Sequence, residues 1–471
     1  MSASPALDFQ AFQEEKHWEL FCQMMHKALD RVLSGLKGSF LADKPLVLKE
    51  ISDLLQGKKQ EFGSYLLQEF IHGQYGPYLE QKWAICPCCG KKIRRNTFSE
   101  RTIETLLGLA TLNRPYFYCR QCKYGFAPLD EALKLSHRRK QDDLQQLAMQ
   151  FIADVPFERA SELFEKSTCV SFSDRSEHGH FSTFMDEASV SEVIPSAEEI
   201  ERRIDQAATS EHRRPVLAVA TDGAHTKIRP PGGRNDKRGP GDYKEAKGFR
   251  IYMLADDHIV QIASWHQITE DKQEITDALK LAAQRIPQHK VRVGLIGDGA
   301  HWLWTCMTEA FPQGRQILDY YHCSEYIHKV AELQFADDPD KALHWVESTM
   351  TRLYYKGGIS HVIGGLKRMH PRDEDAKKQI EKTITYLTNN KGRTGYKGAK
   401  IGGYPIGSGG IESANKFICH VRLKRSGAWW LKPNCNSMLK LRCSIVNGTF
   451  DDLFAKCAAR IKVNKGIVRN A

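Results

Sequence analysis

Apolar residues in the first part of the chain recur every three or four positions, which is typical of amphipathic helices. The run between residues 8 and 80 begins with Phe9, Phe12, Trp18, Phe21, Met25, Leu29, Val32 and Leu33. An amphipathic helix packs either in a core or against a second subunit, and the pattern is the same in both cases. We therefore predict an N-terminal helical region, residues 1–80, without assigning the partner of its apolar face.

A second helical pattern covers residues 128–185. Pro156 separates two short apolar faces, and Ser173 is placed as the N-cap of a third helix. This order predicts a helix-turn-helix-like domain, although any small helical bundle shows the same pattern. Its third helix offers only Arg175, His178 and His180 as donors to DNA. The acidic and polar residues 186–213 predict a linker, which includes a helix at 196–208.

From residue 214 onward, short apolar runs alternate with helical segments. Strands are predicted at 215–220, 249–254, 259–265, 291–296 and 316–320, and helices at 269–283 and 301–310. A turn at 255–258 joins the second and third strands into a hairpin. This order predicts an α/β fold with an RNase H-like mixed sheet, antiparallel in the hairpin and parallel in the remainder.

A helical insertion interrupts this region. Helices are predicted at 326–333, 342–353 and 376–389. Residues 323–395 are therefore predicted to form an insertion domain within a core that comprises residues 214–322 and 396–430. The remaining residues, 431–471, predict a basic C-terminal tail region.

The composition is that of a soluble globular protein. The 471 residues are 41% hydrophobic and 27% charged, which excludes a disordered chain. At roughly 150 residues per domain, this length suggests about three domains. Apolar stretches stay shorter than the ~18 residues of a membrane span, and the polar start lacks a secretory signal. We expect no membrane association and a cytoplasmic location.

The charge is unevenly distributed. The net charge is +11, and residues 413–471 contain 12 Lys or Arg but only 2 Asp or Glu. A smaller excess lies between residues 223 and 250, with 8 basic and 3 acidic side chains. Basic segments favour a polyanionic partner such as nucleic acid, whereas the alternative is a role in solubility alone.

Four cysteines have the spacing of a zinc site. Cys86 and Cys89 form one C-x-x-C pair, and Cys119 and Cys122 form a second. Two such turns supply the four thiolates of a structural Zn²⁺, so residues 81–127 predict a zinc ribbon. Cys88 is a spare thiol, and we favour Cys89 as the ligand because Gly90 follows it. The ribbon either staples a small lobe or also contacts DNA through Lys91, Lys92, Arg94 and Arg95.

The tetrapeptide D-G-A-H follows two of the predicted strands, at 222–225 and 298–301. Side chains just past strand ends project into the crevice where α/β sheets bind ligands. Asp222 and Asp298 would repel each other there unless a divalent cation such as Mg²⁺ lies between them. The alternative is that Asp-Gly is turn chemistry after a strand.

Glu412 is the candidate third acid. It follows a glycine-rich stretch, 407–410, and is placed in the first turn of a helix. Lys416 would lie on the same helical face, and the basic residues Arg422, Lys424 and Arg425 continue toward a phosphate backbone. Trp429 and Trp430 would either stack on a flipped base or form core.

These motifs together resemble the bacterial insertion-sequence DDE transposases of the ISKra type. The matching stretches span about residues 210–440 and lie at 220–223, 296–302, 318–322, 405–412 and 422–429. The chain departs from the family pattern at 411–413, which reads Ile-Glu-Ser in place of Val-Glu-Ala. Its helix-turn-helix-like segment is also poorly basic.

The resemblance implies an RNase H-like catalytic core with an acidic triad at Asp222, Asp298 and Glu412. Two Mg²⁺ (or Mn²⁺) ions would serve DNA strand cleavage and strand transfer. It also implies a D-x-x-H element at Asp319 and His322, which would act near the site or be purely structural. The expected partners are the element's terminal inverted repeats, target DNA and a second copy of the chain, in the bacterial nucleoid. The alternatives are a catalytically inactive, domesticated DNA-binding regulator and another RNase H-like nuclease.

Overall fold

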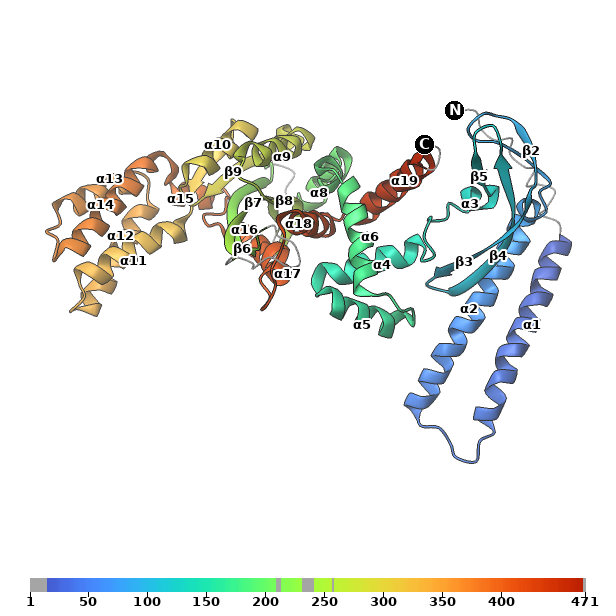
Figure 1. Ribbon diagram of the computed structural model, residues 1–471. Coiled ribbons are helices and arrows are strands. Elements are labelled where there is room, and N and C mark those ends of the chain that lie inside the picture. The colour runs from blue at the N-terminus through green and yellow to red at the C-terminus, as the bar shows by residue number, and fades with distance from the viewer. Residues whose placement is uncertain (1–14, 209–212, 231–240, 256–257, 469–471) are drawn as a thin grey trace. The chain divides into compact units, whose positions relative to one another are not determined.

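The computed structural model describes residues 15–208, 213–230, 241–255 and 258–468 (Figure 1). Phe9 and Phe12 of the predicted first helix lie outside the described residues, as do Asp256 and Asp257 of the predicted hairpin turn. The chain forms two compact units. Unit 1 comprises Met1–Glu187 with Phe454–Ala471, and unit 2 comprises Ala188–Leu453. No helix in the described part of the chain is long and apolar enough to cross a membrane.

Unit 1 begins with two long helices, α1 (Glu15–Phe40) and α2 (Leu48–Leu79), which pack against each other. Ala28 and Val32 of α1 are buried, whereas Trp18, Leu29 and Leu33 are exposed. One face of α1 is therefore buried, whereas other apolar side chains of the same helix are exposed to solvent.

Five strands follow in unit 1. The short strands β1 (Trp83–Ile85) and β2 (Lys92–Arg94) pair antiparallel, and β3 (Thr97–Thr105), β4 (Gly108–Cys119) and β5 (Tyr124–Phe126) form an antiparallel sheet. Strand β4 alternates buried and exposed residues, so one face of this sheet packs on α2. On this face, buried Ile103 of β3 and Leu112 of β4 lie in a cluster with Ile71 of α2 and Leu129.

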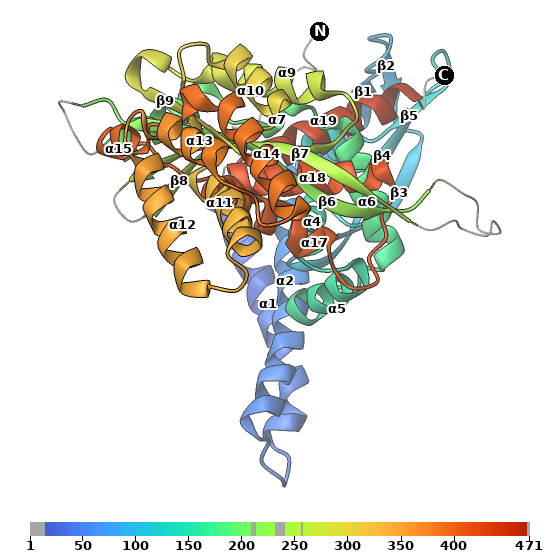
Figure 2. The same cartoon turned by 90° about the vertical axis from the view of Figure 1, so that its left-hand side faces the viewer.

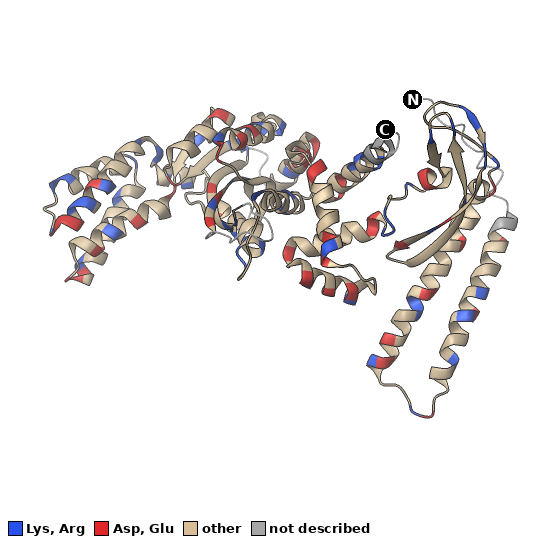
Figure 3. Cartoon of the chain, viewed as in Figure 1, with Lys and Arg blue, Asp and Glu red and all other residues tan. Residues whose placement is uncertain are grey.

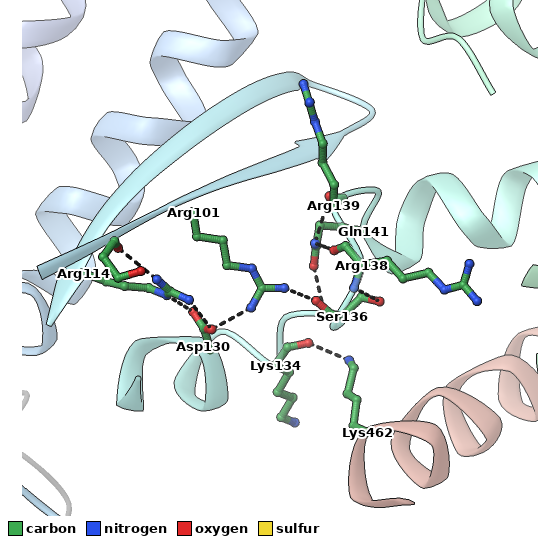
Figure 4. A network of polar contacts seen from close by, with 10 residues as sticks. Arg101, Arg114, Asp130, Lys134, Ser136, Arg138, Arg139, Gln141 and Lys462 are labelled. Atoms are coloured by element: carbon green, nitrogen blue, oxygen red, sulfur yellow. Dashed lines mark hydrogen bonds and ion pairs between the residues drawn. The ribbon is translucent and has the colours of Figure 1, made fainter. Parts of the chain in front are cut away.

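The remaining helices of unit 1 are α3 (Pro128–Ala132), α4 (Asp142–Asp154), α5 (Phe157–Thr168), α6 (Asp174–Glu187) and most of α19 (Phe450–Val468). A polar network ties the sheet to this region (Figure 4). Asp130 accepts hydrogen bonds from Arg101 at 2.6 Å and Arg114 at 2.5 Å, and Lys462 donates to the carbonyl of Lys134 at 2.6 Å.

In the predicted helix-turn-helix-like segment, α6 buries one of its three candidate donors. His180 is buried, and its Nδ1 lies 2.8 Å from Oε1 of Gln145. Arg175 stays exposed and His178 is half-buried.

Unit 2 contains a five-stranded mixed sheet in the order β10-β9-β6-β7-β8. Strands β6 (Val216–Ile228), β7 (Asp242–Ala255) and β8 (His258–Ile268) are antiparallel, and β9 (Arg292–Gly297) and β10 (Arg315–Leu318) run parallel to β6. The predicted antiparallel hairpin and parallel remainder are confirmed. The helices α7 (Val190–Val193), α8 (Ala197–Ala207), α9 (Lys272–Arg285) and α10 (His301–Ala310) complete this part, with the 3-10 turn η2 (Gln288–Lys290).

Between β10 and the last helices of unit 2 the chain forms a helical bundle, whose helices are drawn in yellow-orange to orange in Figure 2. Its helices are α11 (Tyr320–Gln334), α12 (Pro339–Tyr354), α13 (Gly358–Arg368) and α14 (Glu374–Asn389), followed by η3 (Lys391–Arg393) and α15 (Tyr396–Ile401). Helix α13 was not predicted. Next come α16 (Gly409–Ala414), the π-helix η4 (Asn415–His420) and α17 (Val421–Leu423).

The segment predicted as a basic tail is instead helical over its described residues, because α18 (Lys432–Asn447) carries buried Cys435, Met438 and Leu439. This helix covers the free edge of β8. Asn447 accepts a hydrogen bond from the backbone N–H of Ser264 at 2.8 Å and donates to its carbonyl at 2.9 Å. Asn436 does the same at Ile268, at 2.8 and 3.1 Å. Edge groups that would otherwise pair with another strand are thereby satisfied.

Candidate functional site

Asp222 and Asp298 lie where the parallel pairing of β6 and β9 ends. Asp298 follows its strand as predicted, whereas Asp222 lies within β6, because this strand continues to Ile228 in pairing with β7. The last parallel pair is Ala220 of β6 opposite Ile296 of β9. Asp222 comes two residues after Ala220, and Asp298 comes two residues after Ile296. Glu412 is on α16, which packs on β6 and β7. The structure therefore brings the three predicted acids to one region of the molecule.

The negative charge of this region is visible in the pKa of Asp222, which is raised to about 6. Burial is the largest cause, and the carboxylates of Asp298, Glu412 and Glu245 add to it. Oxygen-only donors under mutual repulsion fit a hard divalent cation, since a cation favours the charged form of each carboxylate. The donor set therefore suits Mg²⁺ or Mn²⁺.

Glu245 was missed by the sequence analysis. It lies on β7, opposite His225 of β6, and an added Cβ at Gly223 would meet its carboxylate oxygen at 2.0 Å. Its side chain forms an ion pair with Lys247 at 3.3 Å. The only signal that places Glu245 near Asp222 is the pairing register of two strands, which no motif reveals.

A hydrogen-bonded chain holds the carboxylate of Asp222. The side-chain amide of Asn415 donates to Oδ2 of Asp222 at 2.7 Å, and its Oδ1 lies 3.0 Å from Nε2 of His266. His266 is buried, and burial lowers its pKa to about 4, so the neutral ring donates through Nε2 to Asn415 at pH 7. This contact orients the amide of Asn415 with its N–H groups toward Asp222.

Asn415 is also the first residue of the π-helix η4. A π-turn accommodates an extra residue within a helix and occurs frequently at functional sites. Residues after Asn415 are therefore rotated relative to the face that an uninterrupted α-helix would present.

Gly248 makes room for this chain. Strand pairing places Gly248 between Asp222 on β6 and His266 on β8. A Cβ added at Gly248 would lie 2.3 Å from Cδ2 of His266, which is closer than nonbonded carbon atoms approach. A glycine at this position lets the imidazole lie across β7 and reach Asn415.

We expect Gly248→Ala to lower the free energy of unfolding by about 1–3 kcal/mol, because the added methyl group overpacks against His266. The matched control is Gly365→Ala in α13, where an added Cβ would meet no described atom within 4 Å. That variant is expected to be as stable as the wild type or to gain ~0.5–1 kcal/mol. Scanning calorimetry measures both, and equal stability of the two variants would show that His266 moves freely.

Asp319 connects the insertion helices to Glu412. Its carboxylate is buried, and Oδ1 accepts hydrogen bonds from the backbone N–H of Tyr321 at 2.7 Å and His322 at 2.9 Å. Oδ2 accepts from the N–H of Ser408 at 2.6 Å, and the hydroxyl of Ser408 donates to Oε1 of Glu412 at 2.6 Å. Asp319 thus fixes the loop before α16 to the start of α11.

The other member of the D-x-x-H element, His322, packs against Tyr326 and Tyr386. Nδ1 of His322 lies 3.2 Å from Oε2 of Glu325 on its own helix. The insertion helices also support Asp298, because the hydroxyl of Tyr386 on α14 donates to the Asp298 carbonyl at 2.8 Å. Tyr386 stacks on Tyr326 of α11 with ring centroids 4.0 Å apart.

The predicted DNA-binding residues have different environments. Lys416, Lys424 and Arg425 are exposed. Arg422 is only 3% exposed, and its guanidinium lies 4.8 Å from the ring centroid of Trp430. Burial makes Arg422 inaccessible to a phosphate in this structure. Trp430 is itself buried, and the ring of Trp429 lies 4.0 Å from Nζ of Lys227.

The four predicted zinc ligands of unit 1 also come together. The sulfur atoms of Cys86, Cys89, Cys119 and Cys122 all lie within 4.8 Å of one another, and those of Cys89 and Cys119 are 3.8 Å apart. Four sulfurs around a tetrahedral Zn²⁺ are separated by about 3.8 Å. Cys88 is exposed and is not part of this group. The cluster therefore fits a structural zinc ion.

The first pair lies in the turn between β1 and β2, where the N–H of Gly90 donates to the carbonyl of Cys86 at 3.0 Å and Gly90 has φ +72°. The second pair lies between β4 and β5. The pKa of Cys119 is lowered to about 7, mainly by a hydrogen bond from the backbone of Cys122. This favours the thiolate at Cys119, whereas the pKa of Cys122 is raised, chiefly by its hydrogen bond with Cys89.

Comparison with known proteins identifies a family. The model of an uncharacterised protein family, UPF0236, matches residues 90–453. No curated protein matches the chain. Among solved structures, a chain of the Drosophila P element transposase strand transfer complex is 12% identical, with a TM-score of 0.24, covering 66% of this chain and 80% of that chain. A TM-score of this size does not establish a shared fold.

Proposed function

This chain belongs to the UPF0236 family, and we propose that it is a DNA transposase with an RNase H-like core that cuts and joins DNA strands through Asp222, Asp298 and Glu412. The observation that carries the proposal is the proximity of Asp222 and Asp298 of the five-stranded sheet to Glu412 of α16, which packs on β6 and β7. The sheet has three antiparallel strands followed by two parallel ones in the order β10-β9-β6-β7-β8. The finer likeness to the ISKra type rests on the sequence motifs.

The proposed reaction is an in-line displacement at phosphorus. Two bound Mg²⁺ or Mn²⁺ ions would supply activation of water or a 3′-hydroxyl and stabilisation of the leaving 3′ oxygen. The three acids would hold these ions. Asn415 keeps the Asp222 carboxylate in one orientation, and Ser408 does the same for Glu412. These contacts prearrange two acids before DNA binds.

The proposed partner is DNA, as element ends and as target. Exposed Lys416 on η4, and Lys424 and Arg425 just after α17, would contact phosphates. The zinc ribbon is proposed to hold one structural Zn²⁺ and to present its basic side chains to DNA. We further propose that two copies assemble to hold two element ends, and that the protein acts at the bacterial nucleoid.

The test uses purified protein and a DNA fragment that carries the inverted repeats flanking the coding region. We expect nicking at the repeat ends that requires Mg²⁺ or Mn²⁺. Binding of the repeats without cleavage would favour the regulator. Cleavage of junctions or RNA–DNA hybrids in preference to the repeats would favour another RNase H-like nuclease.

Divalent cations are expected to stabilise the protein more at pH 8 than at pH 5. The pKa of Asp222 is raised in the folded state, so its ionisation destabilises folding as the pH rises from about 4 to 6. A cation bound to the ionised acids offsets this loss, by about 2.7 kcal/mol at a hundredfold excess over its dissociation constant. Thermal unfolding with and without Mn²⁺ measures the effect. Asp222→Asn should remove its pH dependence, and an equal shift at both pH values would argue against a site at Asp222.

A further inference from the structure

Seven basic side chains lie on or against residues 389–404, the segment that joins α14 to the loop before α16. Four of them belong to the segment, and three arginines contact it from other parts of unit 2. We name this group the basic rim, and it comprises Arg213, Arg292, Arg315, Lys391, Arg393, Lys397 and Lys400. Arg315 donates to the carbonyls of Gly395 and Gly398, each at 3.2 Å. Arg292 donates to the carbonyl of Gly402 at 2.8 Å, and Arg213 to that of Ile401 at 3.4 Å.

The positive charge of the basic rim is not neutralised within the described structure. None of its seven members forms an ion pair with a described Asp or Glu, and residues 383–411 contain no acidic residue. Hydrogen bonds to carbonyls fix the guanidinium groups without removing their charge. On α11 and α14, by contrast, Lys329 pairs with Glu332 at 2.9 Å and Lys377 with Glu374 at 3.6 Å. Figure 3 shows both signs of charge along these helices.

A groove of about 510 Å³ lies within the rim, between the edge strand β10 and the loop after α14. Its lining includes Arg315, Gln316, Asn389, Arg393 and Thr394, together with three glycines, and contains no carboxylate. Glycines let a ligand approach the backbone closely. The groove therefore offers cationic and neutral donors to an anion.

The groove is also connected to the proposed active site. Nε of Arg393 donates to Gln316 at 2.7 Å, and its terminal nitrogen donates to Oδ1 of Asn390 at 2.8 Å. Asn390 in turn donates to the carbonyl of Tyr386 at 3.0 Å, and Tyr386 holds the carbonyl of Asp298. Arg393 therefore contacts, through Asn390, the backbone of the helix whose Tyr386 hydroxyl holds the backbone carbonyl of Asp298.

We infer that the basic rim binds the phosphate backbone of DNA and forms a second DNA contact of unit 2, apart from Lys416, Lys424 and Arg425. An extended polyanion fits better than a small anion, because exposed Lys391, Lys397 and Lys400 continue the positive charge beyond the groove. The inference rests on the proposed action on DNA. It adds a second surface that holds DNA at a distance from the three acids.

The test compares two triple variants of the full chain that lose the same charge. The rim variant is Lys391→Gln with Lys397→Gln and Lys400→Gln, all at exposed side chains. The control is Lys280→Gln with Lys329→Gln and Lys377→Gln, whose lysines pair with carboxylates. Affinity for a duplex without element sequence is measured by fluorescence anisotropy between roughly 50 and 200 mM salt.

We expect the rim variant to bind at least about tenfold more weakly at low salt, and its slope of log affinity against log salt to fall by about 2–3, since each duplex phosphate contact contributes ~0.9. The control should keep the wild-type slope. Equal slopes for the two variants would overturn the inference and leave the proposed function standing, whereas no binding by the wild type would remove both. Thr394→Glu, which places a negative charge in the groove, should also weaken binding if the triple variant is unstable.

Discussion

Asp298→Asn is expected to lower metal-dependent strand cleavage at the element ends by about a thousandfold, with DNA affinity unchanged within about twofold. The carboxamide loses the charge that holds a divalent cation, and the reaction depends on that cation for its nucleophile and its leaving group. Asparagine keeps the oxygen that accepts the hydrogen bond from the N–H of Ala300 at 2.8 Å, so the loop after β9 should keep its shape. Gel assays of cleavage and binding measure both quantities.

Glu245→Gln is the matched control, because Glu245 lies near the same carboxylates without belonging to the proposed triad. We expect this variant to cleave within about tenfold of the wild-type rate, the scale of effects around a metal site. Glu412→Gln should instead match Asp298→Asn. The reverse result, with Glu245 essential and Glu412 dispensable, would transfer the third position of the triad to β7.

Loss of zinc is expected to unfold the ribbon. The structural metal contributes about 10–16 kcal/mol in small zinc domains, and β1 and β2 are only three residues long each. Such short strands bury little apolar surface, so the cysteine cluster must supply most of their stability. Cys119→Ser should bind less than one zinc per chain and become sensitive to proteolysis between residues 83 and 94, which β1 and β2 span. Elemental analysis and limited proteolysis provide the measurements.

Cys88→Ser is the control for this prediction, since Cys88 is exposed and outside the cluster. It should retain one zinc per chain and the protease resistance of the wild type. A zinc content that depends on Cys88 and not on Cys89 would reassign the first pair of ligands. Full zinc binding by Cys119→Ser would exclude Cys119 as a zinc ligand.

The order of strands and the meeting of acids follow from local patterns in the sequence. Each of Asp222 and Asp298 comes just after an apolar run of strand length, and the two runs pair in parallel. The spacing of the cysteines likewise predicts that the four thiols lie together. These features depend on residues close together in the chain. Glu245, Gly248 and His266 depend instead on the register among β6, β7 and β8, and a single sequence does not fix which residues lie opposite one another.

The helix after Glu412 shows a second limit. The sequence pattern predicted Arg422 as a DNA contact beside Lys424 and Arg425, but Arg422 is buried against Trp430. The π-turn at η4 changes which side chains of this segment face outward. The basic residues of 431–471 likewise suggested a tail, although the buried apolar residues of α18 within it belong to the core. Net charge describes exposed side chains and does not report which apolar positions lie between them.

The edge-covering role of α18 has a consequence for the nascent chain. Strand β8 ends at Ile268, whereas the asparagines that satisfy its outer backbone groups are at 436 and 447. During synthesis on the ribosome, the whole insertion domain must emerge before this edge is covered. Throughout that interval β8 presents unpaired N–H and C=O groups to neighbouring polypeptides, which is a route to aggregation. The last helix of unit 2 to be translated is thus the one that closes its sheet to other chains.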